Sequence, residues 1–229
     1  MTAEEIRAAF GAESQRLSEV VADIDETEFA RPSPCAPWTV AELVCHTRMT
    51  MGRLPGMLAA PEPAGTGLVP AASYYRADQR FSTGANAERI QSAQRGAAAL
   101  PGRAARARDF AGARQQAWTV LRAAPAGRVV QTRHGDRMLL TEFLRTRVLE
   151  LAVHGLDLAT ALDRPPWMTS QAADVTAALL LPAGAAARLR EEVGWDQVTL
   201  IGKLTGRRPV RPAETGLIRS TGGARLAFG

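Results

Sequence analysis

The segment that runs from Thr141, which we expect to cap a helix, to about Leu162 constrains the fold more than any other part of this 229-residue chain. Its apolar residues recur with the helical period, and two consecutive prolines, Pro165 and Pro166, stop it. These apolar residues share one broad face and are Phe143, Leu144, Val148, Leu151, Leu158 and Leu162. A long helix with a wide apolar face is stable only when other helices cover that face, so the segment predicts a helical bundle.

Helix-start signals recur along the rest of the chain. Thr2 with Glu5, and Thr39 with Glu42, have the spacing of capping boxes and predict helices over about 3–25 and from about 40 to 55. The other expected elements are helices over 86–100, 104–124, 170–181, 184–193 and 197–205, a Pro/Gly-rich loop over 61–72, and a short hairpin over 129–139. With so few strand signals, we predict a mainly α protein. An antiparallel four-helix bundle is expected over residues 1–166, with a small C-terminal extension, 167–229, packed on it.

The composition narrows the classes of function. Lys203 is the only lysine, so 27 of the 28 basic residues are arginine, and the net charge is +5. Such a bias follows from the codons of a GC-rich genome and needs no polyanionic partner, so we expect no nucleic acid, although Arg103–Arg108 is locally basic. No apolar run approaches the roughly 18 residues of a membrane span. Without a signal-peptide pattern or a cysteine framework, we expect a cytoplasmic protein that does not bind membranes.

Glu150 and His154 are the residues that point to chemistry. They lie four positions apart in a predicted helix and therefore on one face, where a carboxylate and an imidazole form two corners of a metal site. His46, about 100 residues upstream, is the best candidate for a third ligand. Three protein ligands leave a coordination position open, which is typical of catalytic sites. The alternatives are an ion pair of Glu150 with Arg147 and a satisfied core role for His46.

Four further polar residues allow two interpretations each. Asp157 either accepts a hydrogen bond from a metal-bound His154 and so orients it, or forms a salt bridge with an arginine such as Arg164. His134, beside a predicted turn, is expected to be an exposed turn residue rather than part of a site. The two cysteines, Cys35 and Cys45, lack CxxC spacing, and we expect small buried apolar roles rather than thiolate ligands.

Two segments resemble the signatures of a known family. Ser33-Pro-Cys-Ala-Pro-Trp-Thr-Val-Ala-Glu-Leu-Val-Cys-His46 resembles the first signature of the mycothiol-dependent maleylpyruvate isomerase family, within the DinB-like superfamily. Arg147-Val-Leu-Glu-Leu-Ala-Val-His-Gly-Leu-Asp-Leu-Ala-Thr-Ala161 resembles the second, and Gly194 to Arg207 is similar to a C-terminal segment of many members. The resemblance implies a DinB-like bundle and a divalent metal, usually zinc, held by His46, Glu150 and His154.

The resemblance also implies a reaction. Family members use mycothiol, the low-molecular-weight thiol of actinobacteria, so we expect a metal-dependent S-transferase or isomerase that adds the metal-bound thiolate to a small electrophile. Arg207, Arg76 and Arg80 are candidates to bind a substrate carboxylate or the thiol. Maleylpyruvate itself is not the expected substrate, because the segment after Pro166 is short for the isomerase. A metal-dependent hydrolase and a non-catalytic small-molecule-binding protein are the alternatives, and the chain is expected to be a monomer or homodimer.

Overall fold

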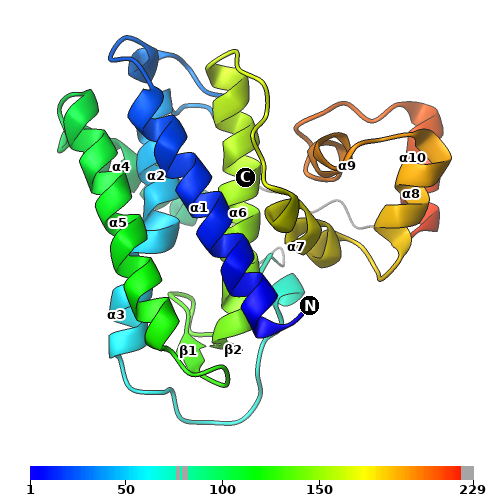
Figure 1. The fold of residues 1–229 in the computed structure, drawn as a ribbon, viewed down its shortest axis with the longest axis horizontal. Helices are drawn as coiled ribbons and strands as arrows, with labels where there is room; N and C mark the ends of the chain where they lie inside the picture. Colours follow the sequence, from blue (N-terminus) through cyan, green and yellow to red (C-terminus); the bar gives the residue numbers. More distant parts are fainter. Residues whose placement is uncertain (76–77, 79–81, 223–229) are drawn as a thin grey trace.

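The computed structural model describes residues 1–75, 78 and 82–222, and this part of the chain is mainly helical (Figure 1). The elements are α1 (Ala3–Asp23), η1 (Glu28–Ala30), α2 (Val40–Gly52), α3 (Leu54–Ala59), η2 (Ala71–Tyr75), α4 (Thr83–Ala98), α5 (Arg103–Ala123), β1 (Val129–Gln131), β2 (Arg137–Leu139), α6 (Leu140–Ala161), α7 (Ser170–Leu180), α8 (Ala185–Val193), α9 (Gln197–Leu204) and α10 (Pro212–Ser220). The predicted helices and the hairpin are present, with helix ends that differ by up to about three residues. The predicted second helix breaks at Arg53 into α2 and α3.

Four helices, α1, α2, α5 and α6, form the bundle (Figure 1). Contacts at the helix ends fix their directions. Arg7 near the start of α1 donates to the carbonyl of Ala124 after α5, whereas Arg103 at the start of α5 pairs with Asp25 after α1. Helices α1 and α5 are therefore antiparallel. Arg31, which precedes α2, donates to the carbonyl of Leu162 after α6, so α2 and α6 are antiparallel as well. This architecture confirms the predicted mainly α bundle.

Helix α6 is the centre of the molecule. The expectation of a single broad apolar face was too narrow, because nearly every residue from Phe143 to Ala159 is buried. The reason is that α1 and α2 cover one side of α6, while α7 and α9 cover another. The predicted Thr141 cap was also wrong, since strand β2 leads directly into the helix and Leu139 occupies the capping position without a side-chain bond.

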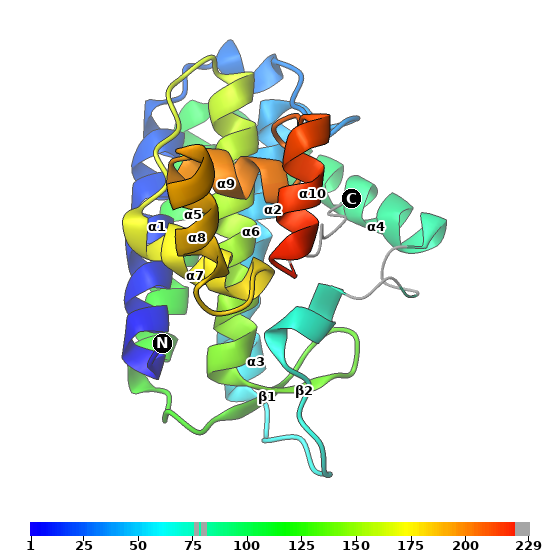
Figure 2. The ribbon, with the colours of Figure 1, turned by 90° about the vertical axis from the view of Figure 1, so that its right-hand side faces the viewer.

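The C-terminal helices extend from one side of the bundle (Figures 1 and 2). Helix α7 packs on α1 and α6, and α9 contacts both α7 and α6. Within this extension, Lys203 Nζ lies 2.7 Å from Glu214 Oε2 and 5.0 Å from the centre of the Trp195 ring. That ion pair joins α9 to α10. The sequence prediction missed α10, although proline at its first position and glutamate at its third, Pro212 and Glu214, are typical of a helix start. The division at residue 166 stays a prediction.

The part of the chain that the structure describes contains no single helix long and apolar enough to cross a membrane. Helices α7 and α8 satisfy the criterion of length and composition only as a pair, and they are bent by 106° at their junction. Much of α7 is buried against the bundle.

Helix α4 packs tightly on α2 at Gly96. A methyl group added there would collide with the buried Cys45 Sγ atom. We expect Gly96→Ala to lower the free energy of unfolding by about 1–3 kcal/mol, because an inserted methyl forces neighbouring groups to shift. Gly112→Ala on α5, where nothing lies within 4 Å of the new methyl, is the control. It should be neutral or stabilise by up to about 1 kcal/mol. Chemical denaturation compares the two, and equal stabilities would contradict the tight contact.

Candidate metal centre

The structure brings together the three predicted ligands. His46 lies on α2, and Glu150 and His154 lie one turn apart on α6, which packs against α2. One donor atom from each residue lies within 4.8 Å of the other two. A helix presents residues four apart on one face, and the contact between the helices supplies the third donor.

The His46 side chain fits a bound cation. Its ring lies edge-on to the His154 ring, with 5.0 Å between centroids, and beneath the Trp38 ring at 4.6 Å. Its Nδ1 atom is buried and has no hydrogen-bond partner among the described residues. A buried polar atom without a partner costs free energy, so a ligand that engages this imidazole would remove a penalty. Two imidazoles and a carboxylate are a donor set that zinc and several other divalent ions accept.

Glu150 is oriented by two groups. Its Oε1 atom accepts a hydrogen bond of 3.1 Å from the Tyr75 hydroxyl, and its Oε2 atom lies 3.4 Å from His154 Nε2. The alternative ion pair with Arg147 is not formed, since Arg147 instead donates from Nε to Thr146 Oγ1. Glu150 therefore presents one oxygen toward the two histidines while a tyrosine anchors the other.

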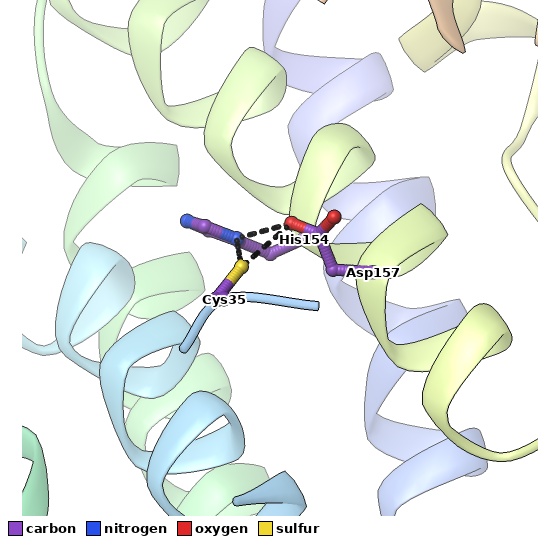
Figure 3. Close-up of side chains that lie close together, drawn as sticks. All are labelled: Cys35, His154 and Asp157. Atoms are coloured by element: carbon purple, nitrogen blue, oxygen red, sulfur yellow. Dashed lines mark hydrogen bonds and ion pairs between the residues drawn. The ribbon is translucent and has the colours of Figure 1, made fainter. Parts of the chain in front are cut away.

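Asp157 fixes the far side of the His154 ring. Its Oδ2 atom lies 3.0 Å from His154 Nδ1 (Figure 3). The Asp157 side chain is buried. Arg207 donates from Nε to Oδ1 and from Nη2 to Oδ2, both at 3.1 Å. The structure thus contains both contacts, one with His154 and one with an arginine, which is Arg207; the orientation of a metal-bound His154 by Asp157 stays a prediction. A carboxylate on Nδ1 leaves Nε2 as the nitrogen that faces Glu150 and His46.

Arg207 reaches Asp157 because of how helix α9 ends. Gly206 follows the helix with a φ of 78°, a left-handed conformation that favours glycine and turns the chain sharply. Arg207 Nη1 donates to the Thr205 carbonyl, which holds the guanidinium against the bundle. The role of Arg207 in binding substrate stays a prediction, but two of its nitrogens already donate hydrogen bonds to Asp157. Arg76 and Arg80 lie outside the described residues.

Cys35 is the member of this cluster that sequence reasoning missed. Its thiol donates to Asp157 Oδ2 at 3.2 Å and lies 4.0 Å from His154 Nδ1 (Figure 3). Cys35, His154 and Asp157 are therefore a second group of possible ligands. Because Cys35 and Asp157 share the Nδ1 side of the ring, they do not form a nucleophilic triad, in which thiol and carboxylate bind opposite nitrogens. The sequence signal for the position of Cys35 was the proline-rich turn that contains it. In this turn the Ser33 hydroxyl donates to the Trp38 carbonyl and accepts a hydrogen bond from the Cys35 amide.

The electrostatics match the geometry. Burial, and then the charge of His154, lower the pKa of His46 to about 3, so His46 is neutral. Burial alone would lower the pKa of His154, but hydrogen bonds with Asp157, Cys35 and Glu150 raise it. Burial by itself would raise the pKa of the Glu150 and Asp157 carboxyl groups. His154 and nearby arginines outweigh burial and lower the pKa of both groups, that of Asp157 to about 2. A cation would meet a neutral imidazole and an ionised carboxylate, and would replace a proton on His154.

The three side chains open onto a cavity of about 480 Å³, a size typical of small-molecule sites. Tyr74, Tyr75 and several arginines form other parts of its wall. His134 lies at the hairpin turn as expected, but it is half-buried and lines the cavity, with its ring centre 5.8 Å from that of Tyr74.

The model of the mycothiol maleylpyruvate isomerase N-terminal domain family matches residues 10–159, well over half of the chain. The chain belongs to this family. The matched part contains all three predicted ligands, whereas Arg207 lies beyond it. Membership confirms the resemblance found in the sequence and the expectation of an enzyme of the isomerase or transferase type.

Solved structures are similar in fold. Two crystal structures of the mycothiol-dependent maleylpyruvate isomerase, one of them a histidine-to-alanine mutant, align with TM-scores of 0.56 and 0.55. Each shares 16% sequence identity with this chain, and the alignment covers 82% of this chain and 72% of the other. The search of curated proteins gives no match.

Proposed function

We propose that the protein is a divalent-metal-dependent thiol transferase or isomerase that uses mycothiol and a small electrophile. The observation that carries the proposal is the convergence of His46, Glu150 and His154 at the wall of a cavity. The matching family is named for a mycothiol-dependent isomerase, which supports mycothiol as the thiol. Zinc is the metal we expect, although this donor set accepts other divalent ions.

Different residues of the site would have different roles in the reaction. His46, Glu150 and His154 would hold the metal, which when bound lowers the pKa of a thiol so that the reactive thiolate exists at neutral pH. Asp157 keeps the His154 ring in one orientation, and Tyr75 does the same for Glu150. The Trp38 ring packs against the His46 ring, with 4.6 Å between the ring centres. The thiolate sulfur would add to one carbon of an activated double bond, and the π electron pair would move to the neighbouring group. Expulsion of the thiolate after rotation about the resulting single bond gives isomerisation, whereas uptake of a proton with retention of the adduct gives transfer.

Removal of the metal tests the proposal. Protein treated with a chelator and then desalted should lose thiol consumption with a reactive test electrophile, and one equivalent of zinc should restore it. The measurement is thiol loss over time, together with elemental analysis of each sample. Activity that survives in demonstrably metal-free protein would contradict the proposal. Turnover of the electrophile without thiol would instead indicate hydrolysis.

A further inference from the structure

Two buried polar atoms without a hydrogen-bond partner among the described residues lie beside the same glycine of α6. They are Glu13 Oε1 on α1 and Trp167 Nε1 in the segment before α7. A methyl group added to Gly155 would lie 3.7 Å from Glu13 Oε1 and 3.5 Å from Trp167 Nε1. We propose that a water molecule binds beside Gly155, between Glu13 and Trp167, and joins the C-terminal extension to the bundle.

The Glu13 side chain has only half of its bonding capacity filled. The residue is 0% exposed, and its Oε2 atom accepts hydrogen bonds from the Thr169 amide at 2.8 Å and the Thr169 hydroxyl at 2.7 Å. A buried carboxyl oxygen without a partner costs free energy, and so does the buried N–H of an indole. One ligand that engages Glu13 Oε1 and Trp167 Nε1 together removes both costs.

The chemistry of the two groups selects water as that ligand. Burial raises the pKa of Glu13, while the hydrogen bonds from Thr169 act in the opposite direction. The ligand must therefore suit both forms of the carboxyl group, and it must accept from the indole N–H in each case. Water donates to an ionised Glu13 or accepts from a protonated one. A metal cation would meet the indole hydrogen, and chloride would be repelled by an ionised Glu13.

Gly155 leaves room for the water. It lies inside α6, where glycine is less favourable than alanine because it loses more conformational freedom on folding. Packing does not exclude alanine, since the nearest neighbours of an added methyl group lie 3.5 Å away or more, which is ordinary van der Waals contact. That methyl group would instead occupy the space beside Glu13 Oε1 and Trp167 Nε1. A water site therefore gives a physical reason for glycine at this position.

The proposed site lies where the C-terminal extension begins. Thr169 Oγ1 accepts from the Ala172 amide and so caps α7, and Glu13 holds this cap through its Oε2 atom. Through the water, the other oxygen of Glu13 would hold Trp167 as well. A single carboxyl group on α1 would thus fasten the whole segment 167–169 to the bundle, independently of metal and thiol chemistry.

A crystal structure of the full chain at about 2 Å resolution or better tests the proposal directly. We expect a water molecule within about 3.2 Å of both Glu13 Oε1 and Trp167 Nε1. A direct hydrogen bond between the two side chains would overturn the proposal, as would a space without electron density between them. An ion identified there by anomalous scattering would overturn it too.

The variant Gly155→Ala tests the site in solution. We expect its unfolding equilibrium constant to be at least about tenfold larger than that of the unchanged protein, because the methyl group displaces the water and leaves two buried polar atoms unpaired. Gly112→Ala on α5 is the matched control and should not raise this constant, since nothing lies within 4 Å of its methyl group. Chemical denaturation measures both. A Gly155→Ala protein as stable as the control would contradict the proposal.

A crystal structure of Gly155→Ala separates loss of the water from crowding. Leu17, 3.9 Å from the added methyl group, is its third close neighbour after Glu13 and Trp167. We expect all three side chains to keep their positions while the water is lost. Displaced side chains around a retained water would attribute the loss of stability to crowding and overturn the proposal.

Discussion

Replacement of His154 by alanine is expected to remove the metal from the purified protein and to lower thiol-dependent turnover by at least about 10³-fold, or about 4 kcal/mol of transition-state stabilisation. His154 is one of three donors, and the two that remain do not hold a divalent ion well. The fold should survive the change. Alanine favours helices, Glu150 keeps its bond from Tyr75, and Asp157 keeps its pair with Arg207.

The His154→Ala experiment has a control in the same cavity. His134→Ala removes an imidazole that lines the cavity but is not among the grouped donors, so this variant should retain the metal. Elemental analysis gives the metal content per chain, and far-UV circular dichroism checks the helices. A His154→Ala protein that keeps both its metal and its turnover would refute the assigned ligand set.

Asp157→Asn is expected to weaken metal binding by about 10–100-fold without abolishing it. The variant removes the charge that holds His154 Nδ1 at 3.0 Å, so the ring is less basic and less firmly oriented. It also deprives Arg207 of its carboxylate, and we expect the free energy of unfolding to fall by about 1–3 kcal/mol. Competition with a chromophoric chelator measures the affinity, and chemical denaturation measures the stability.

Arg207→Gln separates these two effects. It breaks the ion pair with Asp157 but leaves the contact between Asp157 and His154 in place. We therefore expect a loss of stability similar to that of Asp157→Asn, with a smaller loss of metal affinity. If both variants weaken metal binding equally, orientation of His154 by Asp157 is not the cause.

Local signals explain what could be predicted from the sequence. Capping boxes at Thr2 and Thr39, and the proline pair after α6, determine where helices begin and end within a few residues of chain. The spacing of Glu150 and His154 is local in the same sense, because a helix alone places both on one face. The predicted ends of these helices therefore agree closely with the structure.

Contacts between distant segments explain what could not be predicted. Arg207 meets Asp157 across 50 residues, and Cys35 meets it across 122. These contacts depend on how α6 is rotated and on how the chain turns at each end, which no local pattern specifies. Arg147 illustrates the same limit. Its position one turn from Glu150 suggested an ion pair, but packing against Phe143 and Tyr74 directs the guanidinium elsewhere.

The ion pair between Arg207 and Asp157 also couples metal binding to the docking of the segment that follows α9. Arg207 belongs to the segment that follows α9, and Asp157 touches the histidine that would hold the metal. By thermodynamic reciprocity, whatever free energy the docked segment adds to metal binding, the metal returns to docking. The metal content of the protein would then report on whether the C-terminal extension is in place, and loss of the metal would loosen helices that never touch it.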